Sequence, residues 1–414
     1  MPDWHAWRFV SVNVLRVILV LIGVGRAVFA QRGTPPPEAP WNATRVVDAA
    51  VHDLCARRVA LLGEPPMHGF GRTLELKVQI VRRLVSECHF NALLIESGSY
   101  DFLKIAERLR SGQTVTPSMV AAGIGGLWAN REVAALVPFL AEEAQRGHLV
   151  LGGLDDQLGS GTYAQREMPA DLAAYIPNDR ERATCFATLQ RHMLWQYSAD
   201  EPYSPSDRAR ILSCLDKMEP GTTRRDDATT READLAMVQN LRRTLARDFG
   251  QGSGVDEATR VFNDRDRSMY ENFQWWVARV PAPAKVIVWT ATNHAAKSLI
   301  GVPGLERSIS LGSYIDSNYG ADAFALGFSA LSGSYALGQR PARALIPAPR
   351  NSLEYVVLDR DTVEAQYVGR DELRRHGVLP ARPLGPDVKD ADWSRLFDAL
   401  VVLREERPPH PTPP

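Results

Sequence analysis

Short apolar runs that end in an ionisable side chain occur four times in this chain, and this repetition constrains the fold more than any other feature. The runs cover residues 58–62, 91–95, 149–154 and 286–289. They are rich in Val, Ile and Leu, and helical patterns separate them. Such runs are typical of buried parallel strands. We therefore predict an α/β fold with a largely parallel central sheet flanked by helices.

The ionisable residues that follow these runs are expected to meet at one edge of the sheet. Glu64 and His68 follow the first run. Glu96, Asp155 and His294 follow the other three. In sheets of this type the ligand site lies outside the carboxyl ends of the strands. Two histidines and three acids at one edge predict a hydrolytic site.

A large helical insertion is expected to interrupt the sheet. Residues 168 to about 280 show helical patterns and no convincing strand. We interpret them as a cover over the sheet edge, either a lid or a plain structural bundle. Strands are expected to resume after this insertion, with the fourth run at residues 285–289 and further strands at 323–329 and 355–358. The whole α/β domain is predicted to span residues 46–400.

Both ends of the chain are predicted to lie outside this domain. Residues 1–30 contain a positive N-terminal segment, the apolar stretch 17–25 and small residues before Gln31, which is typical of a secretory signal peptide. An uncleaved anchor is the alternative, although the stretch is short for a bilayer span. Residues 31–45 are predicted to be a Pro-rich linker and 401–414 a disordered Pro-rich tail. We expect an exported protein, periplasmic or extracellular, with no stable membrane insertion after signal cleavage.

The charge balance argues against a nucleic-acid partner. Lys and Arg number 48 and Asp and Glu number 49, so the net charge is -1. A nucleic-acid-binding protein is expected to show a basic excess. The expected partner is a small molecule instead.

Four cysteines remain after the predicted cleavage site, and an even number in an exported protein suggests disulfides. Cys185 and Cys214 lie in consecutive helical patterns, so we expect them to pair first. Cys55 and Cys88 are the other two. Four buried thiols are the alternative.

Several motifs in order along the chain resemble the erythromycin esterase family. Gly63-Glu64 with His68-Gly69 and the strand ending at Glu96 begin the series. The other matching segments are residues 127–133, 265–272, 289–297 and 311–314, and the resemblance covers roughly residues 46–335. It implies an α/β hydrolase that cleaves an ester or lactone without a metal or other cofactor, and a role in the response to antibiotics.

The chain also differs from the family pattern at three places. Pro65-Pro66-Met67 makes the loop between Glu64 and His68 one residue longer. Lys77 stands where many members have Arg, and Ala291-Thr292 stand where the family usually has His-Asn. Proline stiffens the first loop, and losing a histidine alters the polar lining of the pocket.

The histidines are the expected acid–base groups. We expect His68 to act as general base that activates water, since imidazole titrates near neutral pH. Glu64 is expected to accept a hydrogen bond from the His68 ring. His294 is expected to stabilise the oxyanion or to serve as a second acid–base group.

The remaining candidates are charged or support the site. Glu96 is expected to be partly buried and paired with a cation. Lys77 and Arg265 are the candidate cations, either neutralising Glu96 or stabilising the tetrahedral intermediate. A second set is expected to contact substrate or support these groups, namely Asp155, Asp266 and Trp128.

Two alternative functions remain open at this level. One is a metal-dependent hydrolase, because Glu64, His68, Glu96 and His294 are all possible oxygen or nitrogen ligands. The other is a non-enzymatic protein of related fold that binds haem or another ligand. The substrate and the oligomeric state are not predicted.

Overall fold

The computed structural model describes residues 43–218, 228–248, 254–338, 340–358 and 363–412. The predicted signal peptide and the linker up to residue 42 therefore lie outside the described residues. The first helix, α1 (Thr44–Cys55), begins just inside the predicted linker, so the folded domain starts slightly earlier than expected. Among the described residues, no helix is both long and apolar enough to cross a membrane.

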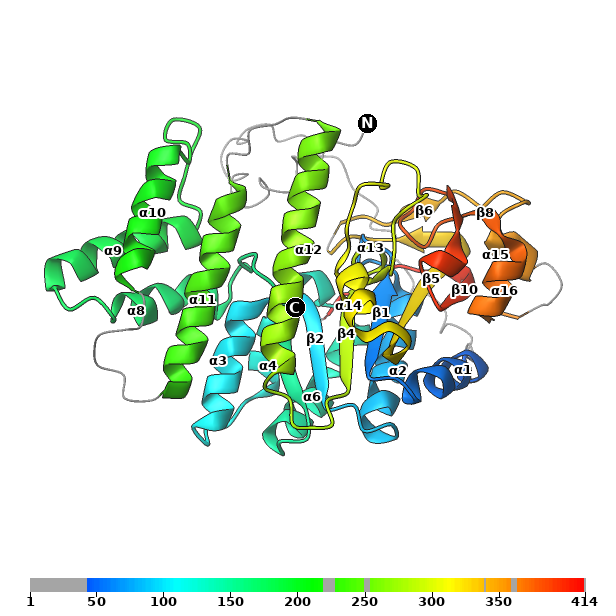
Figure 1. Cartoon of the computed structure of the whole chain (residues 1–414), viewed down its shortest axis with the longest axis horizontal. Helices are drawn as coiled ribbons and strands as arrows, with labels where there is room; N and C mark the ends of the chain where they lie inside the picture. Colours follow the sequence, from blue (N-terminus) through cyan, green and yellow to red (C-terminus); the bar gives the residue numbers. More distant parts are fainter. Residues whose placement is uncertain (1–42, 219–227, 249–253, 339, 359–362, 413–414) are drawn as a thin grey trace, which may run out of the picture. The chain divides into compact units, whose positions relative to one another are not determined.

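The central sheet has the strand order β3-β2-β4-β1-β5-β10-β7, and β6 pairs with β5. Figure 1 labels β2, β4, β1, β5 and β10 of this sheet. Every pairing from β3 across to β10 is parallel, whereas β7 and β6 pair antiparallel. The strands are β1 (Val59–Glu64), β2 (Ala92–Gly98), β3 (Val150–Asp155), β4 (Val286–Ala291), β5 (Ala323–Tyr335), β6 (Arg343–Leu345), β7 (Ala365–Gly369) and β10 (Ala399–Glu406). A separate two-stranded sheet contains β8 (Val378–Ala381) and β9 (Lys389–Asp392). The predicted fold class is confirmed.

Helices cover both faces of the sheet, because its central strands are apolar on both sides. All six residues of β1 and of β4 are buried, as this arrangement requires. The helices that connect or flank the strands are α2 (Gly71–Ser86), α3 (Ser99–Arg110), α4 (Pro117–Ile124), α5 (Arg131–Ala134), α6 (Val137–Gln145), α7 (Tyr163–Arg166), α13 (Thr292–Ala295), α14 (Leu311–Tyr319), α15 (Leu353–Leu358) and α16 (Arg370–His376).

The segment between β3 and β4 is helical where the structure describes it, as predicted. It contains α8 (Met168–Ala173), α9 (Asp179–Met193), α10 (Pro205–Lys217), α11 (Ala228–Arg247) and α12 (Val255–Val277). A disulfide between Cys185 and Cys214 joins α9 to α10, which confirms the predicted pair. Cys55 and Cys88 form the second disulfide. Free thiols, the alternative, are absent at all four positions.

The last of these helices, α12, brings the helical segment back to the sheet. It packs against β3 and β2, and Figure 1 shows it beside β2. Trp276 anchors it, since its indole N–H donates to the carbonyl of Gly153 in β3 at 3.0 Å. Its buried face also includes Asp266 and Asn272. This anchoring places α12 directly above the strand ends that form the site.

Two predictions about the C-terminal third are wrong. Residues 355–358 belong to helix α15 and not to a strand, because an apolar run this short does not distinguish the two periods. The tail predicted to be disordered from residue 401 begins inside β10, whose first five residues are fully buried. Strand β10 lies between β5 and β7, so its backbone groups are paired on both sides.

Candidate functional site

The candidate site lies where β1, β2, β3 and β4 end, at the carboxyl edge of the sheet. Glu64 and Asp155 are the last residues of β1 and β3, and Glu96 lies near the end of β2. His294 follows β4 in the short helix α13. A glycine is needed at position 63, since a Cβ atom there would lie 2.8 Å from the Cα of Thr292. Close packing of α13 on β1 thus brings His294 of α13 to the same edge of the sheet as Glu64 of β1.

His68 and Glu64 form the first histidine–carboxylate pair. The Nδ1–H of His68 donates to Glu64 Oε1 at 2.9 Å, which is the hydrogen bond expected from the sequence. The same oxygen accepts from the indole N–H of Trp128 at 2.9 Å. His68 itself has φ 51°, a left-handed conformation that is uncommon for residues other than glycine. The fixed tautomer leaves the other ring nitrogen, Nε2, as the proton acceptor.

Lys77 pairs with Glu64 and not with Glu96, so the first of its two expected roles is wrong, whereas Arg265 does pair with Glu96. Both side chains of the Lys77–Glu64 ion pair are fully buried. The ammonium also lies 4.3 Å from the centre of the Trp289 ring. Burial lowers the pKa of Lys77, and the charge of Glu96 opposes that shift. The ion pair nevertheless places the Lys77 ammonium directly against the carboxylate that orients His68.

His68 is held in its neutral form over a wide pH range. Burial lowers the pKa of His68 to about 4, with further lowering from the charges of His294 and Arg265. Glu96 opposes this shift. No described residue forms a hydrogen bond with its Nε2 atom. A neutral imidazole with an available nitrogen is the form that can accept a proton from water.

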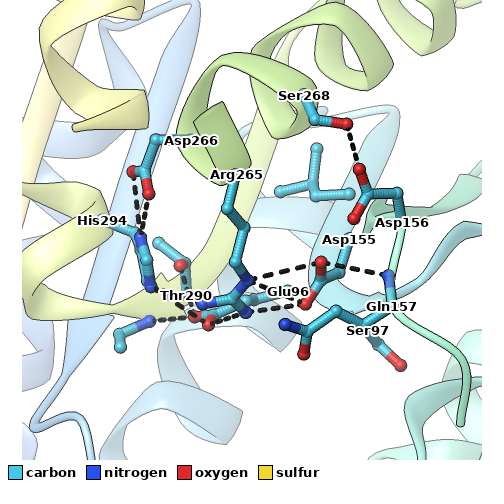
Figure 2. A network of polar contacts seen from close by, with 12 residues as sticks. Glu96, Ser97, Asp155, Asp156, Gln157, Arg265, Asp266, Ser268, Thr290 and His294 are labelled. Carbon is cyan, nitrogen blue, oxygen red and sulfur yellow. Dashed lines mark hydrogen bonds and ion pairs between the residues drawn. The ribbon is translucent and has the colours of Figure 1, made fainter. Parts of the chain in front are cut away.

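Arg265 of α12 links Glu96 and Asp155 in a charged network (Figure 2). Its Nη2 atom lies 2.9 Å from Glu96 Oε1 and 2.6 Å from Asp155 Oδ2. The other oxygen of Glu96 accepts from Thr290 Oγ1 at 2.6 Å and from the backbone N–H of Ala291 at 2.7 Å. Burial by itself raises the pKa of Glu96, but the positive charges of His294 and Arg265 hold it well below the usual range. Glu96 is therefore an ionised, fully hydrogen-bonded acid.

His294 and Asp266 form the second histidine–carboxylate pair (Figure 2). His294 Nδ1 lies 2.8 Å from Asp266 Oδ2. Its Nε2 atom lies 3.1 Å from Arg265 Nη1 and 3.3 Å from Glu96 Oε1. Phe262 stacks on the ring with centroids 5.2 Å apart. A neutral ring can accept from Arg265 and a protonated ring can donate to Glu96, so both forms have a partner.

Burial by itself lowers the pKa of His294, but the carboxylates of Asp266 and Glu96 raise it above its ordinary value. His294 thus differs from His68, whose pKa is depressed. One site therefore contains a neutral imidazole beside an imidazole that favours protonation. Environments that separate two such pKa values are typical of acid and base partners in catalysis.

Comparison with known proteins identifies the family of this chain. The family model "Erythromycin esterase" matches residues 85–405. The chain belongs to the erythromycin esterase family. The match begins after Glu64, His68 and Lys77, so their placement rests on the geometry described above.

Relatives of the chain are distant in sequence and similar in fold. A putative hydrolase, YbfO, from Bacillus subtilis (strain 168) is 22% identical over 301 residues, which cover 68% of this chain and 66% of that protein. The chain thus spans just under two thirds of that relative's length. A structure described as a succinoglycan biosynthesis protein has a TM-score of 0.66 at 14% identity, covering 91% of this chain and 94% of the other. A histidine variant of the erythromycin esterase EreC, in its open conformation, has a TM-score of 0.56 at 16% identity, covering 87% and 93%.

In this erythromycin esterase-family site, the carboxylates that could serve as metal ligands already have partners. Glu64 pairs with Lys77, and Glu96 pairs with Arg265 and accepts a hydrogen bond from a backbone N–H group. Among the described residues, no group of three or more His, Cys, Asp or Glu side chains is arranged to hold a metal ion. Positive side chains next to both acids disfavour a divalent cation there.

Sequence reasoning missed a buried ion pair behind the site. Asp156 is fully buried and bonds to Arg247 of α11, with Arg247 Nη1 at 2.8 Å. Ser268 donates to the same carboxylate at 2.5 Å (Figure 2). The signal in the sequence is the second acid of the Asp155-Asp156 pair, which directly follows the apolar run of β3. Asp156 joins α11 and α12 to the strand that positions Asp155.

Proposed function

We propose that this erythromycin esterase-family protein is an exported hydrolase that cleaves an ester or lactone with water activated by His68, without a metal. The observation that supports it most is the state of His68. Its Nδ1–H is fixed on Glu64, burial keeps the ring neutral, and no residue that the structure describes forms a hydrogen bond with its Nε2. A general base of this kind contributes roughly 10²–10⁴-fold to a hydrolytic rate.

In the proposed reaction, His68 removes a proton from water as the oxygen attacks the substrate carbonyl carbon. The carbonyl oxygen becomes an oxyanion, and the N–H groups of Arg265 and a protonated His294 are the positive donors proposed to stabilise it. Collapse of the tetrahedral intermediate breaks the bond to the alcohol oxygen. That oxygen takes a proton from His294. His68 then releases its proton to solvent and His294 takes one up from solvent, so both groups return to their starting states.

Ionised Glu96 has a supporting role in this scheme. It accepts from Arg265 and faces the Nε2 atom of His294, so it keeps both cations in place between turnovers. Asp155 holds the guanidinium from the other side at 2.6 Å. The two acids therefore orient Arg265 and supply no proton themselves.

A hydrolysis screen tests the proposal. The protein, dialysed against a chelator, is incubated with simple esters, lactones and macrolides, and products that gain one water are identified by mass spectrometry. We expect turnover to survive dialysis and to fall roughly 10²–10⁴-fold in His68→Ala. Equal rates in wild type and His68→Ala would contradict the mechanism. Loss on chelation with recovery on metal addition would favour the metal-dependent alternative, and a Soret band without turnover would favour haem binding.

Export is the second part of the proposal. The N-terminal pattern at residues 1–30 and the two disulfides support it, since disulfides persist mainly in oxidising compartments. Cell fractionation with N-terminal sequencing of the mature protein checks it. A cytoplasmic protein that retains Met1 would contradict export.

A further inference from the structure

The segment that follows the central strand β10 contacts two loops of the site. Glu406 ends β10 and its side chain is buried. Residues 407–411 continue from it along α2 and α5. We call residues 406–411 the 406–411 segment. It lies beyond the part of the chain that matches the family model, which ends at residue 405.

The first contact is with the start of α2. Phe70, which precedes the helix, provides no side-chain cap. The N–H groups of Arg72 and Thr73 donate instead to the Glu406 carboxylate at 3.0 and 2.8 Å. The N–H of Gly71 donates to the Arg407 carbonyl at 2.7 Å. These are groups that a helix cannot satisfy internally, so the segment completes the end of the helix that directly follows His68.

The second contact is with the loop that contains Trp128. Arg407 Nη1 donates to Glu132 Oε1 at 2.7 Å, and the Glu132 side chain is only 4% exposed. His410 donates to the same carboxylate through its backbone N–H at 3.0 Å. Asn130 forms an isolated β-bridge with Pro411, and its own N–H donates to the carbonyl of Trp128 at 2.8 Å. The segment therefore holds the backbone next to Trp128.

Side chains from both loops donate hydrogen bonds to the same carboxylate oxygen. Trp128 and His68 each donate to Glu64 Oε1 at 2.9 Å, one from the loop before α5 and the other from the loop before α2. The helices α2 and α5 are also in contact with each other. A shift of either loop changes the hydrogen bonds that fix the His68 tautomer.

We propose that the 406–411 segment positions His68 and Trp128 on Glu64, with Arg407 and Glu132 as positioning residues. The buried Glu132 carboxylate keeps its place only while cations and N–H groups compensate it, because an unpaired buried charge is costly. The expected effect on turnover rests on the proposed function. The expected effect on the Trp128–Glu64 hydrogen bond is independent of it, so the positioning role and the hydrolase function can be contradicted separately.

The experiment measures that hydrogen bond and the kinetics in the same variants. The Trp128 indole resonance of ¹⁵N-labelled protein, assigned with Trp128→Phe, reports hydrogen exchange with solvent. In Arg407→Ala we expect exchange to accelerate about tenfold or more, and kcat for a model ester to fall about tenfold while KM changes less than about threefold. Arg407→Lys is expected to recover part of both losses.

The matched control is Arg83→Ala, which removes an arginine that pairs with Glu87 near the other end of α2. Its Trp128 exchange and kcat should equal those of wild type. If Arg407→Ala does not fold, Glu132→Gln is tested instead, with the same expected changes in Trp128 exchange, kcat and KM. Unchanged Trp128 exchange in a folded Arg407→Ala or Glu132→Gln protein would overturn the proposal, as would an equal change in Arg83→Ala. If Trp128 exchange is faster in the variants but the wild-type protein has no esterase activity, the result would support the positioning role and contradict the proposed function.

Discussion

The site contains two histidine–carboxylate pairs with similar hydrogen bonds and opposite electrostatic surroundings. In the first, His68 bonds to Glu64, whose charge is already compensated by buried Lys77. In the second, His294 bonds to Asp266 and also faces Glu96. The pKa is lowered to about 4 by burial in the first and raised above its ordinary value by two carboxylates in the second.

This difference shows that a carboxylate next to a histidine does not by itself determine the protonation state. What matters is the sum of burial and all nearby charges. For His68 burial outweighs the charge of Glu96, whereas for His294 the carboxylates of Asp266 and Glu96 outweigh burial. Asp266 forms its ion pair with His294 itself, so the two rings are suited to base and acid roles respectively.

Removing the carboxylate of each pair is expected to give the largest contrast. Glu64→Gln deprives His68 of its tautomer partner and should lower kcat by on the order of 10²–10⁴-fold. Asp266→Asn should lower kcat less, and the alkaline limb of the pH–rate profile should move to lower pH because a carboxylate that raises the pKa of His294 is lost. Steady-state kinetics across pH measure both.

The control for these variants is Asp264→Asn, which removes an acid of α12 that pairs with Arg260 on the helix surface. Its kinetics should match wild type. Equal losses and unchanged pH limbs in Glu64→Gln and Asp266→Asn would mean that the two pairs do not have separate roles.

The cation of the first pair should be more important for stability than any surface cation. Lys77→Met leaves Glu64 as an uncompensated buried charge and should lower the free energy of unfolding by about 3–5 kcal/mol. Lys104→Met, at a partly exposed pair with Asp171, should change it by about 1 kcal/mol or less. Urea unfolding at pH 7 measures both. A Lys77→Met protein as stable as Lys104→Met would show that Glu64 does not need this cation.

The depressed pKa of His68 should appear as a smaller, pH-dependent effect on stability. The unfolded chain protonates His68 below about pH 6.5, whereas the folded protein does so only near pH 4. Stability therefore falls as pH decreases through 6.5. His68→Asn, which tolerates the left-handed backbone at this position, should lose about 2 kcal/mol less than wild type between pH 8 and pH 5. Parallel curves for the two proteins would contradict the depressed pKa.

Much of the fold and the position of most candidate site residues were predictable, because they follow apolar runs of clear type. The strands that end near Glu64, Glu96 and Asp155 were recognised, as was the helical segment before β4. Strand β10 was missed since its apolar part is followed by charged and proline residues, which resemble a tail. Its place in the middle of the sheet depends on strand order, which local pattern does not contain.

The pairing of the charged residues was less predictable than their identity. Lys77 was expected near Glu96, but its position in α2 places its side chain in an ion pair with Glu64. Asp266 was expected only to support the site, and it is the direct partner of His294. Such pairings depend on how α2 and α12 cross the sheet, and that crossing is set by packing that sequence spacing does not reveal.

An NMR titration of the two imidazoles tests the division of roles most directly. Protein labelled with ¹⁵N-histidine, with His68→Asn and His294→Asn used for assignment, is titrated from pH 4 to pH 9. We predict that His68 stays neutral with Nδ1 protonated until the pH approaches 4, and that His294 stays protonated above its ordinary pKa of 6.5. Two histidines that titrate together near pH 6.5 would contradict separate base and acid roles.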